Sequence, residues 1–193
     1  MKLEYASCRA LWILAMTLMV AVTLFSQENR KDPKAMLPND RLKLDVPNFF
    51  CPTDKTATGG QPSLATLEEA AAQGYKTVVN LRTENEGTDL QAEAEKVRGL
   101  GMKYVHIPVR SDQPKAADAE AFLQTARAAN NYPMFIHCGS GNRVGAFWMI
   151  HRVLDDRWSI ERAEKEAVQI GMRSPTLKDF ALKYIDQKRK QAP

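Results

Sequence analysis

The segment HCGSGNRVG, residues 137–145, places a cysteine and an arginine around two glycines. A thiolate is a strong nucleophile, and an arginine offers a permanently charged planar fork to an oxyanion. Glycines permit the positive φ angles that a tight turn needs if its backbone N–H groups are to point inward. We therefore predict a nucleophile at Cys138 and an anion-binding loop made of Gly139, Ser140, Gly141, Asn142 and Arg143.

The elements around this loop must present it at the edge of a sheet. MFIHC, ending at Cys138, has the pattern of a buried strand, and residues 144–154 that of a helix. Upstream, apolar strands at 77–81 and 103–109 alternate with helical segments at 89–100 and 118–129. This alternation predicts an α/β fold with a central, mostly parallel sheet of about four to five strands flanked by helices. Ligands gather at the carboxyl ends of such strands, which is where we expect Cys138.

The remaining segments complete the predicted domain. Phe49–Cys51 could open a first strand, and residues 56–62 read as a short edge strand that runs into a glycine turn. Ser63 or Thr66 can cap the helix that follows. Helical patterns at about 144–154, 159–171 and 175–190 predict a helical C-terminal part.

Composition limits the classes of protein that this chain can represent. Its 193 residues are 44% hydrophobic and 26% charged, with a formal net charge of +4. These values argue against a disordered chain and against a protein with several membrane spans. The basic residues gather at the C-terminus, where a solvated helix face is the more common explanation than a nucleic-acid surface, so we expect no nucleic-acid partner.

The N-terminal residues resemble a targeting segment. An uncharged apolar run at residues 10–25 follows two basic residues and precedes a polar stretch, which is the layout of a secretory signal. We predict a signal peptide or N-terminal anchor at 1–26, a linker at 27–45 and one folded domain at 46–193. The protein would then be exported, periplasmic or secreted, or else attached to a membrane through residues 10–25. Cys51 is expected to be a small buried hydrophobic residue.

Several segments together are similar to a known family. GQPSLATLEEAAAQGYKTVVNLRTENE, YVHIPV and HCGSGNRVGAFW look like successive blocks of a bacterial phosphatase-like family related to the beta-lactamase-hydrolase-like proteins. The loop itself resembles the active-site loop of the protein tyrosine and dual-specificity phosphatase superfamily. The resemblance covers about residues 50–152 and implies a phosphatase-like fold.

The resemblance also implies roles for particular residues. By position, Cys138 would attack phosphorus to form a phosphocysteine, and Arg143 would bind the phosphate oxygens. Asp112, just after a predicted strand, is the candidate general acid for the leaving oxygen, with a turn or helix cap as its alternative role. His137 would brace the loop by hydrogen bonds, although a buried core histidine is equally compatible with the sequence. The substrate would be a phosphomonoester on a phosphorylated protein or a small phosphorylated molecule.

The loop departs from the superfamily pattern in one respect. Tyrosine phosphatases typically place five residues between the cysteine and the arginine, whereas Cys138 and Arg143 have four between them. Four-residue spacing also occurs in rhodanese sulfurtransferases, which suggests a Cys138 persulfide as the alternative chemistry. A non-catalytic module that binds an anion or a partner is the third hypothesis.

Other polar residues give weaker indications. Arg82 and Glu84 follow the 77–81 strand at the same sheet edge, where they could help bind substrate or hold the loop, although a surface ion pair is the favoured arrangement for them. No pair of residues has metal-ligand spacing, and no nucleotide-binding motif is present, so we expect neither a metal nor an organic cofactor.

Overall fold

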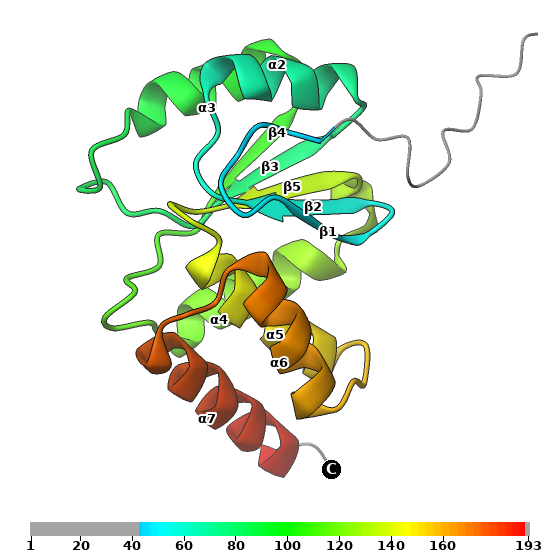
Figure 1. The fold of residues 1–193 in the computed structure, drawn as a ribbon, viewed down its shortest axis with the longest axis vertical. Helices are drawn as coiled ribbons and strands as arrows, with labels where there is room; N and C mark the ends of the chain where they lie inside the picture. Colours follow the sequence, from blue (N-terminus) through cyan, green and yellow to red (C-terminus); the bar gives the residue numbers. More distant parts are fainter. Residues whose placement is uncertain (1–42, 192–193) are drawn as a thin grey trace, which may run out of the picture. The chain divides into compact units, whose positions relative to one another are not determined.

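A computed structural model describes residues 43–191 as a five-stranded sheet with helices on both faces (Figure 1). The strands are β1 (Phe50–Thr53), β2 (Thr56–Gly59), β3 (Thr77–Asn80), β4 (Lys103–His106) and β5 (Met134–His137). The helices are α2 (Leu64–Ala72), α3 (Leu90–Gly99), α4 (Ala116–Arg127), the short 3-10 helix η2 (Ala129–Asn131), α5 (Asn142–Leu154), α6 (Ile160–Ile170) and α7 (Pro175–Gln191). The predicted α/β fold with a helical C-terminal part is confirmed.

The sheet order is β1-β2-β5-β3-β4, and every pairing except the antiparallel β1–β2 pair is parallel. The mostly parallel sheet was therefore predicted correctly. The expectation that residues 56–62 form an edge strand was wrong, because β1 covers the outer side of β2 and leaves β2 inside the sheet. β5 lies at the centre, between β2 and β3, so the residue that follows it emerges in the middle of the carboxyl edge.

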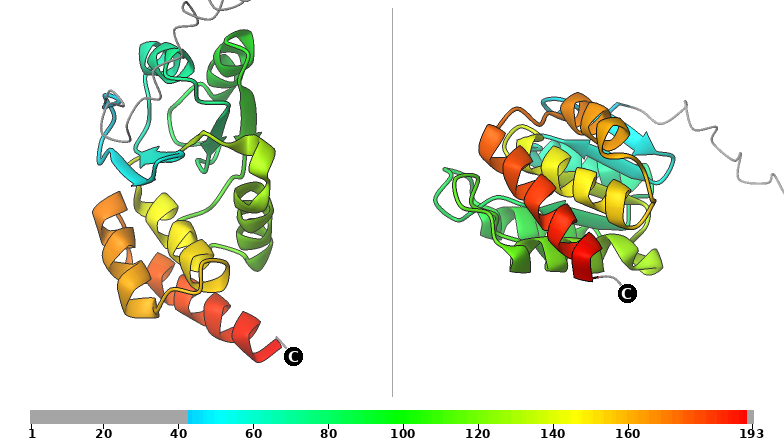
Figure 2. Two further views of the ribbon diagram at one scale, coloured as in Figure 1. Left: turned by 90° about the vertical axis from the view of Figure 1, so that its right-hand side faces the viewer. Right: turned by 90° about the horizontal axis from the view of Figure 1, so that it is seen from below.

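Two apolar clusters fill the space on the two faces of the sheet, because successive side chains of a strand point to opposite sides. Val78 and Phe135 belong to the cluster beneath α2 and α3. Val79 and Ile136 belong to the larger cluster, which α4, α5, α6 and α7 cover from the other side (Figures 1 and 2). The short strands thus read as continuous apolar runs because both of their faces are buried.

Local signals account for most of the element boundaries. Ser63 rather than Thr66 caps α2, since the Ser63 Oγ accepts a hydrogen bond from the Thr66 backbone N at 3.0 Å. Helix α4 begins at Ala116, two residues before the predicted start, because the Asp118 carboxylate accepts a hydrogen bond from the Lys115 N–H. Cys51 was expected to be buried but lies exposed on β1, which is the outermost strand.

The predicted signal or anchor at 1–26 lies outside the described residues, as does most of the predicted linker. Among residues 43–191, no helix is both long and apolar enough to cross a membrane.

Candidate active site

Cys138 lies where the sequence placed it, directly after the central strand at the carboxyl edge of the sheet. His137, the last residue of β5, is in register with Gly59 of β2 on one side and with Asn80 of β3 on the other. Only 1% of Cys138 is exposed. The parallel strands therefore bring the loops after β2, β3 and β5 together around this thiol.

The loop from Cys138 to Gly141 turns two of its carbonyl groups outward. The Gly139 carbonyl accepts a hydrogen bond from the Gln61 N–H at 3.2 Å, and the Ser140 carbonyl accepts one from Asn48 Nδ2 at 2.9 Å. Gly141 has a φ of 83°, and a Cβ at this position would lie 2.2 Å from the Ile170 carbonyl oxygen. Only glycine fits here, for both conformational and steric reasons.

Helix α5 begins at Asn142 without a side-chain cap, because its N-cap residue is Gly141. The first N–H groups of a helix have no acceptor inside the helix, and the helix dipole adds partial positive charge at this end. This helix terminus therefore offers N–H donors and a favourable field to an anion that sits next to Cys138.

The side chain of Asn142 stabilises the packing of a neighbouring turn. Its Oδ1 accepts hydrogen bonds from the backbone N–H groups of Arg173 and Ser174, at 2.8 and 3.1 Å. These bonds hold the turn between α6 and α7 against the start of α5. Because the side chain is used in this way, the prediction that Asn142 binds substrate now applies to its backbone N–H alone, and it stays a prediction.

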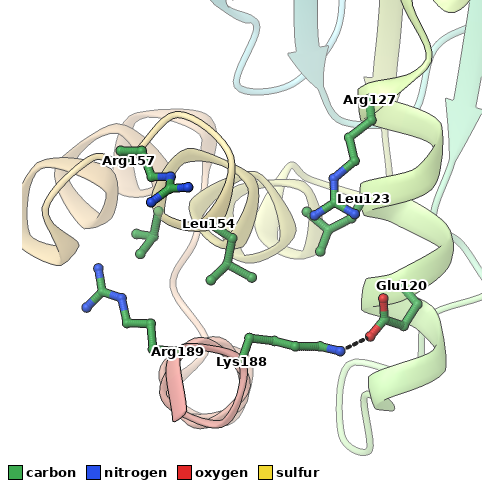
Figure 3. A pocket seen from close by; sticks show the side chains of 8 residues that line it. Glu120, Leu123, Arg127, Leu154, Arg157, Lys188 and Arg189 are labelled. Atoms are coloured by element: carbon green, nitrogen blue, oxygen red, sulfur yellow. Dashed lines mark ion pairs between the residues drawn. The ribbon is translucent and has the colours of Figure 1, made fainter. Parts of the chain in front are cut away.

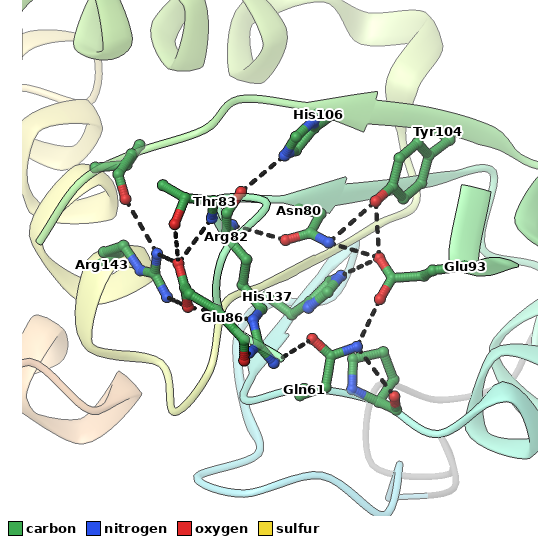
Figure 4. Close-up of polar contacts among 12 residues, drawn as sticks. Gln61, Asn80, Arg82, Thr83, Glu86, Glu93, Tyr104, His106, His137 and Arg143 are labelled. Carbon is green, nitrogen blue, oxygen red and sulfur yellow. Dashed lines mark hydrogen bonds and ion pairs between the residues drawn. The ribbon is translucent and has the colours of Figure 1, made fainter. Parts of the chain in front are cut away.

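The Arg143 guanidinium is buried beside the loop, with 6% of the residue exposed. Its NH1 donates to the Val109 carbonyl at 3.0 Å, and NH1 and NH2 donate to the two carboxylate oxygens of Glu86 at 2.5 and 2.6 Å (Figure 4). A Cβ on Gly139 would lie 3.8 Å from NH2. Burial lowers the pKa of Arg143, but Glu86 and the nearby Cys138 together raise it above its usual value. The predicted nucleophile and anion-binding arginine are therefore neighbours in space.

The contacts of Arg143 with Glu86 and Val109 leave one edge of its guanidinium unused by these two residues, and the guanidinium also interacts with the Cys138 thiol. Of five N–H donors in the group, two on NH1 and one on NH2 are used by Glu86 and Val109. The Nε–NH2 edge retains two parallel donors, which is the geometry that binds two oxygens of a carboxylate or phosphate. Glu86 therefore holds the NH1–NH2 edge of the guanidinium, and the Nε–NH2 edge is left to bind an anion.

Glu86 belongs to the loop between β3 and α3, and the sequence did not single it out. Besides Arg143, its Oε1 accepts hydrogen bonds from the Thr83 N–H at 2.7 Å and the Thr83 hydroxyl at 2.9 Å. Although burial raises the pKa of Glu86, the hydrogen bonds from Arg143 and Thr83 lower it to about 2. The carboxylate is thus charged at neutral pH and holds the guanidinium in place. Glu86 is one of three acidic residues in the segment 84–89, which gave no sign of which one turns inward.

Arg82 corrects another expectation from the sequence. Instead of a surface pair with Glu84, Arg82 is buried and its Nε lies 3.2 Å from Glu86 Oε2. Its NH1 donates to Gln61 Oε1 at 2.9 Å. Arg82 therefore links the loop after β2 to the loop after β3, underneath the candidate site.

A buried polar network supports the strand that leads into the loop (Figure 4). His137 Nε2 lies 3.1 Å from Glu93 Oε1, which also accepts hydrogen bonds from Asn80 Nδ2 at 2.7 Å and the Tyr104 hydroxyl at 3.0 Å. Gln61 Nε2 donates to the other Glu93 oxygen at 2.5 Å. Burial raises the pKa of Glu93, but the hydrogen bonds from His137 and its other partners lower it to about 2.

Glu93 comes from α3, so this network joins α3 to β3, β4 and β5. The geometry is compatible with the predicted bracing role of His137, which acts on Cys138 through the backbone next to it. Glu93 itself was not predicted. Its position on a helix with acidic neighbours made it look like a solvent-facing residue.

Asp112, the candidate general acid, lies exposed in the segment between β4 and α4. Its carboxylate accepts hydrogen bonds from Arg110 Nε and NH2, at 3.1 and 2.7 Å. Hydrogen bonding to Arg110 lowers the pKa of Asp112. The carboxyl group is therefore ionised in this arrangement and would have to leave Arg110 to deliver a proton.

A cavity of about 320 Å³ opens between the loop after β3 and the segment that carries Asp112. Thr83 and Arg110 are among the residues that line it, whereas Cys138, Arg143 and Asp112 are not. Because Thr83 binds Glu86 and Arg110 follows Val109 in the chain, the lining includes neighbours of both residues that contact Arg143. Among the described residues, no group of three or more His, Cys, Asp or Glu is placed to hold a metal ion.

Comparison with protein families gives a match over residues 48–155, more than half of the chain, to the family described as "Beta-lactamase hydrolase-like protein, phosphatase-like domain". A beta-lactamase hydrolase-like protein of Agrobacterium fabrum is 32% identical over 116 residues, which are 58% of this chain and 26% of that protein. One from Xylella fastidiosa strain Temecula1 is 32% identical over 120 residues, which are 60% of this chain and 27% of that protein. The chain thus spans about a quarter of the length of these curated relatives.

Solved structures with the same fold include several phosphatases. The core catalytic domain of the PP-IP phosphatase SIW14 from S. cerevisiae, in complex with citrate, has a TM-score of 0.63 at 18% identity, covering 76% of this chain and 90% of that one. Tk-PTP in its active form has a TM-score of 0.62 at 19% identity, covering 74% and 98%. P. aeruginosa TpbA in complex with pTyr has a TM-score of 0.57 at 17% identity, covering 80% and 90%. These similarities show that this chain has the fold of phosphatases related to the tyrosine and dual-specificity enzymes.

Proposed function

Because the chain belongs to the phosphatase-like domain family of the beta-lactamase hydrolase-like proteins, we propose that it is a cysteine-dependent phosphatase that acts on a phosphomonoester. The observation that carries the proposal is the buried Arg143 guanidinium, held beside Cys138 at the uncapped start of α5 with its Nε–NH2 edge unused by Glu86. Such an edge and a helix N-terminus can bind a phosphate from two sides.

In the proposed reaction the Cys138 thiolate attacks phosphorus. An S–P bond forms, the bond between phosphorus and the leaving oxygen breaks, and the leaving group departs as an alcohol or phenol once it gains a proton. Water then attacks phosphorus and loses a proton to the group that protonated the leaving oxygen, the S–P bond breaks, inorganic phosphate leaves and the thiolate is regenerated. Arg143 and the N–H groups at the start of α5 stabilise the charge that spreads over the phosphate oxygens in both steps.

The proton for the leaving group is assigned to Asp112. This assignment requires its carboxyl group to turn from Arg110 toward the phosphate bound beside Arg143, because the pairing with Arg110 keeps it ionised. An acid matters most when the leaving oxygen is a strong base. Asp112→Asn should therefore slow hydrolysis of phenyl phosphate far more than that of p-nitrophenyl phosphate. Asp54→Asn, an exposed change in the turn between β1 and β2, is the matched control.

The central test is phosphate release from p-nitrophenyl phosphate by the full chain. Cys138→Ser and Arg143→Ala should each abolish it, because they remove the nucleophile and the oxyanion clamp. Activity that survives both changes refutes the mechanism.

The substrate is proposed to be either a phosphorylated protein or a small phosphorylated molecule. Support for both comes from the structural neighbours, since TpbA was crystallised with pTyr and SIW14 is named a PP-IP phosphatase. A phosphotyrosine peptide and a small organic phosphate ester, assayed side by side, separate these substrate classes.

Sulfur transfer is the second candidate function, and the four residues between Cys138 and Arg143 favour it. In that reaction the thiolate takes the outer sulfur of thiosulfate, sulfite leaves, and cyanide removes the sulfur as thiocyanate. Thiocyanate formation without phosphatase activity would select this chemistry. Inactivity in both assays, with phosphate still protecting Cys138 from alkylation, would select an anion-binding module.

A further inference from the structure

A second cavity, lined by basic residues, lies at the C-terminal end of α5, whereas the candidate active site lies at its N-terminal end. Figure 3 shows the side chains that line this cavity. Its volume is about 390 Å³, which is within the range of small-molecule sites. Helix α5 runs from Asn142 to Leu154, so at about 1.5 Å per residue its two ends are roughly 18 Å apart. A phosphate bound beside Arg143 therefore does not fill this cavity.

Four basic side chains and one acidic side chain line the cavity, and they come from three separate parts of the fold. Arg127 ends α4, Arg157 lies in the turn between α5 and α6, and Lys188 and Arg189 lie in the last part of α7. The one lining acid is Glu120. The cavity is thus strongly positive.

Local carboxylates neutralise only half of this charge. Lys188 Nζ lies 2.5 Å from Glu120 Oε1, and Arg127 NH2 lies 2.8 Å from Asp155 Oδ1. Arg157 and Arg189 form no ion pair with a carboxylate in the part of the chain that the structure describes. Hydrogen bonds from its own backbone N–H and from Ser159 lower the pKa of the exposed Glu161, and the charge of Arg189 adds a smaller effect in the same direction. In Figure 3 both arginines lie on the side of Leu154 away from Glu120.

The backbone of Arg157 adds a second observation. Its φ is 60°, in the left-handed region that glycine or asparagine occupies at lower cost. Arg157 lies in the turn that ends α5, where Trp158 N–H donates back to the Arg152 carbonyl at 3.0 Å, and a glycine would adopt this conformation at lower cost. Trp158, the neighbouring aromatic residue, stacks instead with Arg152 and Arg162, so packing on that ring does not account for Arg157.

We propose that this cavity is a second anion-binding site, in which Arg157 and Arg189 hold the phosphate of a small organic phosphate whose apolar body covers Leu154. Two guanidinium groups that form no ion pair with a described carboxylate match a dianionic phosphate. Leu123, Val153 and Leu154 give the cavity an apolar lining for the rest of the ligand. The proposal does not depend on phosphatase activity, because the site lies at the other end of α5.

The test is calorimetric titration of hexyl phosphate into the full chain with Cys138→Ser and Arg143→Ala, which silence the loop. We expect one saturable binding event. Arg157→Gln with Arg189→Gln should weaken it about tenfold or more, since two charge-assisted contacts are lost. Lys165→Gln with Lys183→Gln removes the same charge from exposed positions outside the cavity and should leave the affinity within about twofold.

Two further comparisons make the result specific. Inorganic phosphate should bind at least about fivefold more weakly than hexyl phosphate, because it leaves the apolar lining uncovered. Arg157→Gly should weaken binding of hexyl phosphate yet raise Tm, since glycine tolerates the left-handed backbone. Absence of saturable binding, equal loss in both double variants, or equal affinity for the two ligands would overturn the proposal.

Discussion

Replacing Glu86 by glutamine should destabilise the fold in a way that depends on pH. The change removes the charge that faces Arg143 and leaves a buried guanidinium with one carbonyl partner, Val109. The difference between the ordinary pKa of 4.5 and about 2 corresponds to roughly 3 kcal/mol. Because 26% of the Glu86 side chain is exposed, solvent screening reduces our expectation to about 2 kcal/mol at pH 7.

The sign of the pH dependence follows from the direction of the pKa change. The pKa of Glu86 is lower in the folded state than in the unfolded state, so the unfolded state binds its proton more tightly. The contribution of Glu86 is therefore complete above the unfolded pKa of 4.5 and is lost as the pH falls toward 2. By pH 3 less than about half of it should remain.

Urea unfolding of the wild type and Glu86→Gln, at steps from pH 7 to pH 3, measures this contribution directly. The difference in unfolding free energy should shrink with pH, because a protonated glutamate resembles glutamine. Glu84→Gln, an exposed change in the same loop, controls for the loss of one negative charge. A difference below about 0.5 kcal/mol at pH 7, or one that does not change with pH, refutes the bracing role of Glu86.

Two further changes test the packing that surrounds the loop. Gly141→Ala should cost about 3 kcal/mol in urea unfolding, because it combines a strained φ with a Cβ in contact with the α6 backbone. Gly99→Ala, the control at an open helical position, should be neutral or slightly stabilising. Equal effects of the two changes would contradict this account. Glu166→Gln should cost about 2 kcal/mol, because it removes the buried charge that Arg152 Nε contacts at 2.7 Å and leaves the half-exposed Asp156 as the charged partner of Arg152. Glu164→Gln, which breaks only a half-exposed pair, should cost less than about 1 kcal/mol, and similar losses for the two would show that burial adds nothing.

The sequence predicted the positions of those site residues that are determined by a local sequence pattern. The strand that ends at His137 is an apolar run, the glycines after it permit a tight turn, and Arg143 follows in the first turn of a helix. Those short-range facts place Cys138 and Arg143 side by side at the carboxyl edge of a parallel sheet. The order of elements was predictable for the same reason, because alternating strands and helices leave few topologies.

The partners of these residues depend on contacts over long sequence distances, which periodicity does not reveal. Glu86 is 57 positions from Arg143, and Glu93 is 44 positions from His137. Each stands in a polar segment where solvent exposure is the usual outcome, and each turns inward because the sheet order brings its loop or helix to the strand that carries its partner. Arg82 was misjudged for the same reason.

The hydrogen bonds from the α6–α7 turn to Asn142 indicate which helices belong to the functional domain of this protein. Gly171 approaches the loop so closely that a Cβ there would lie 2.7 Å from the Ser140 carbonyl oxygen. The family match stops at residue 155, yet the wall that holds the loop in shape comes from residues 170–174. The two C-terminal helices and the turn between them therefore support the conformation of the loop. A fragment that ends at the family boundary would keep Cys138 but lose the residues that pack against its loop.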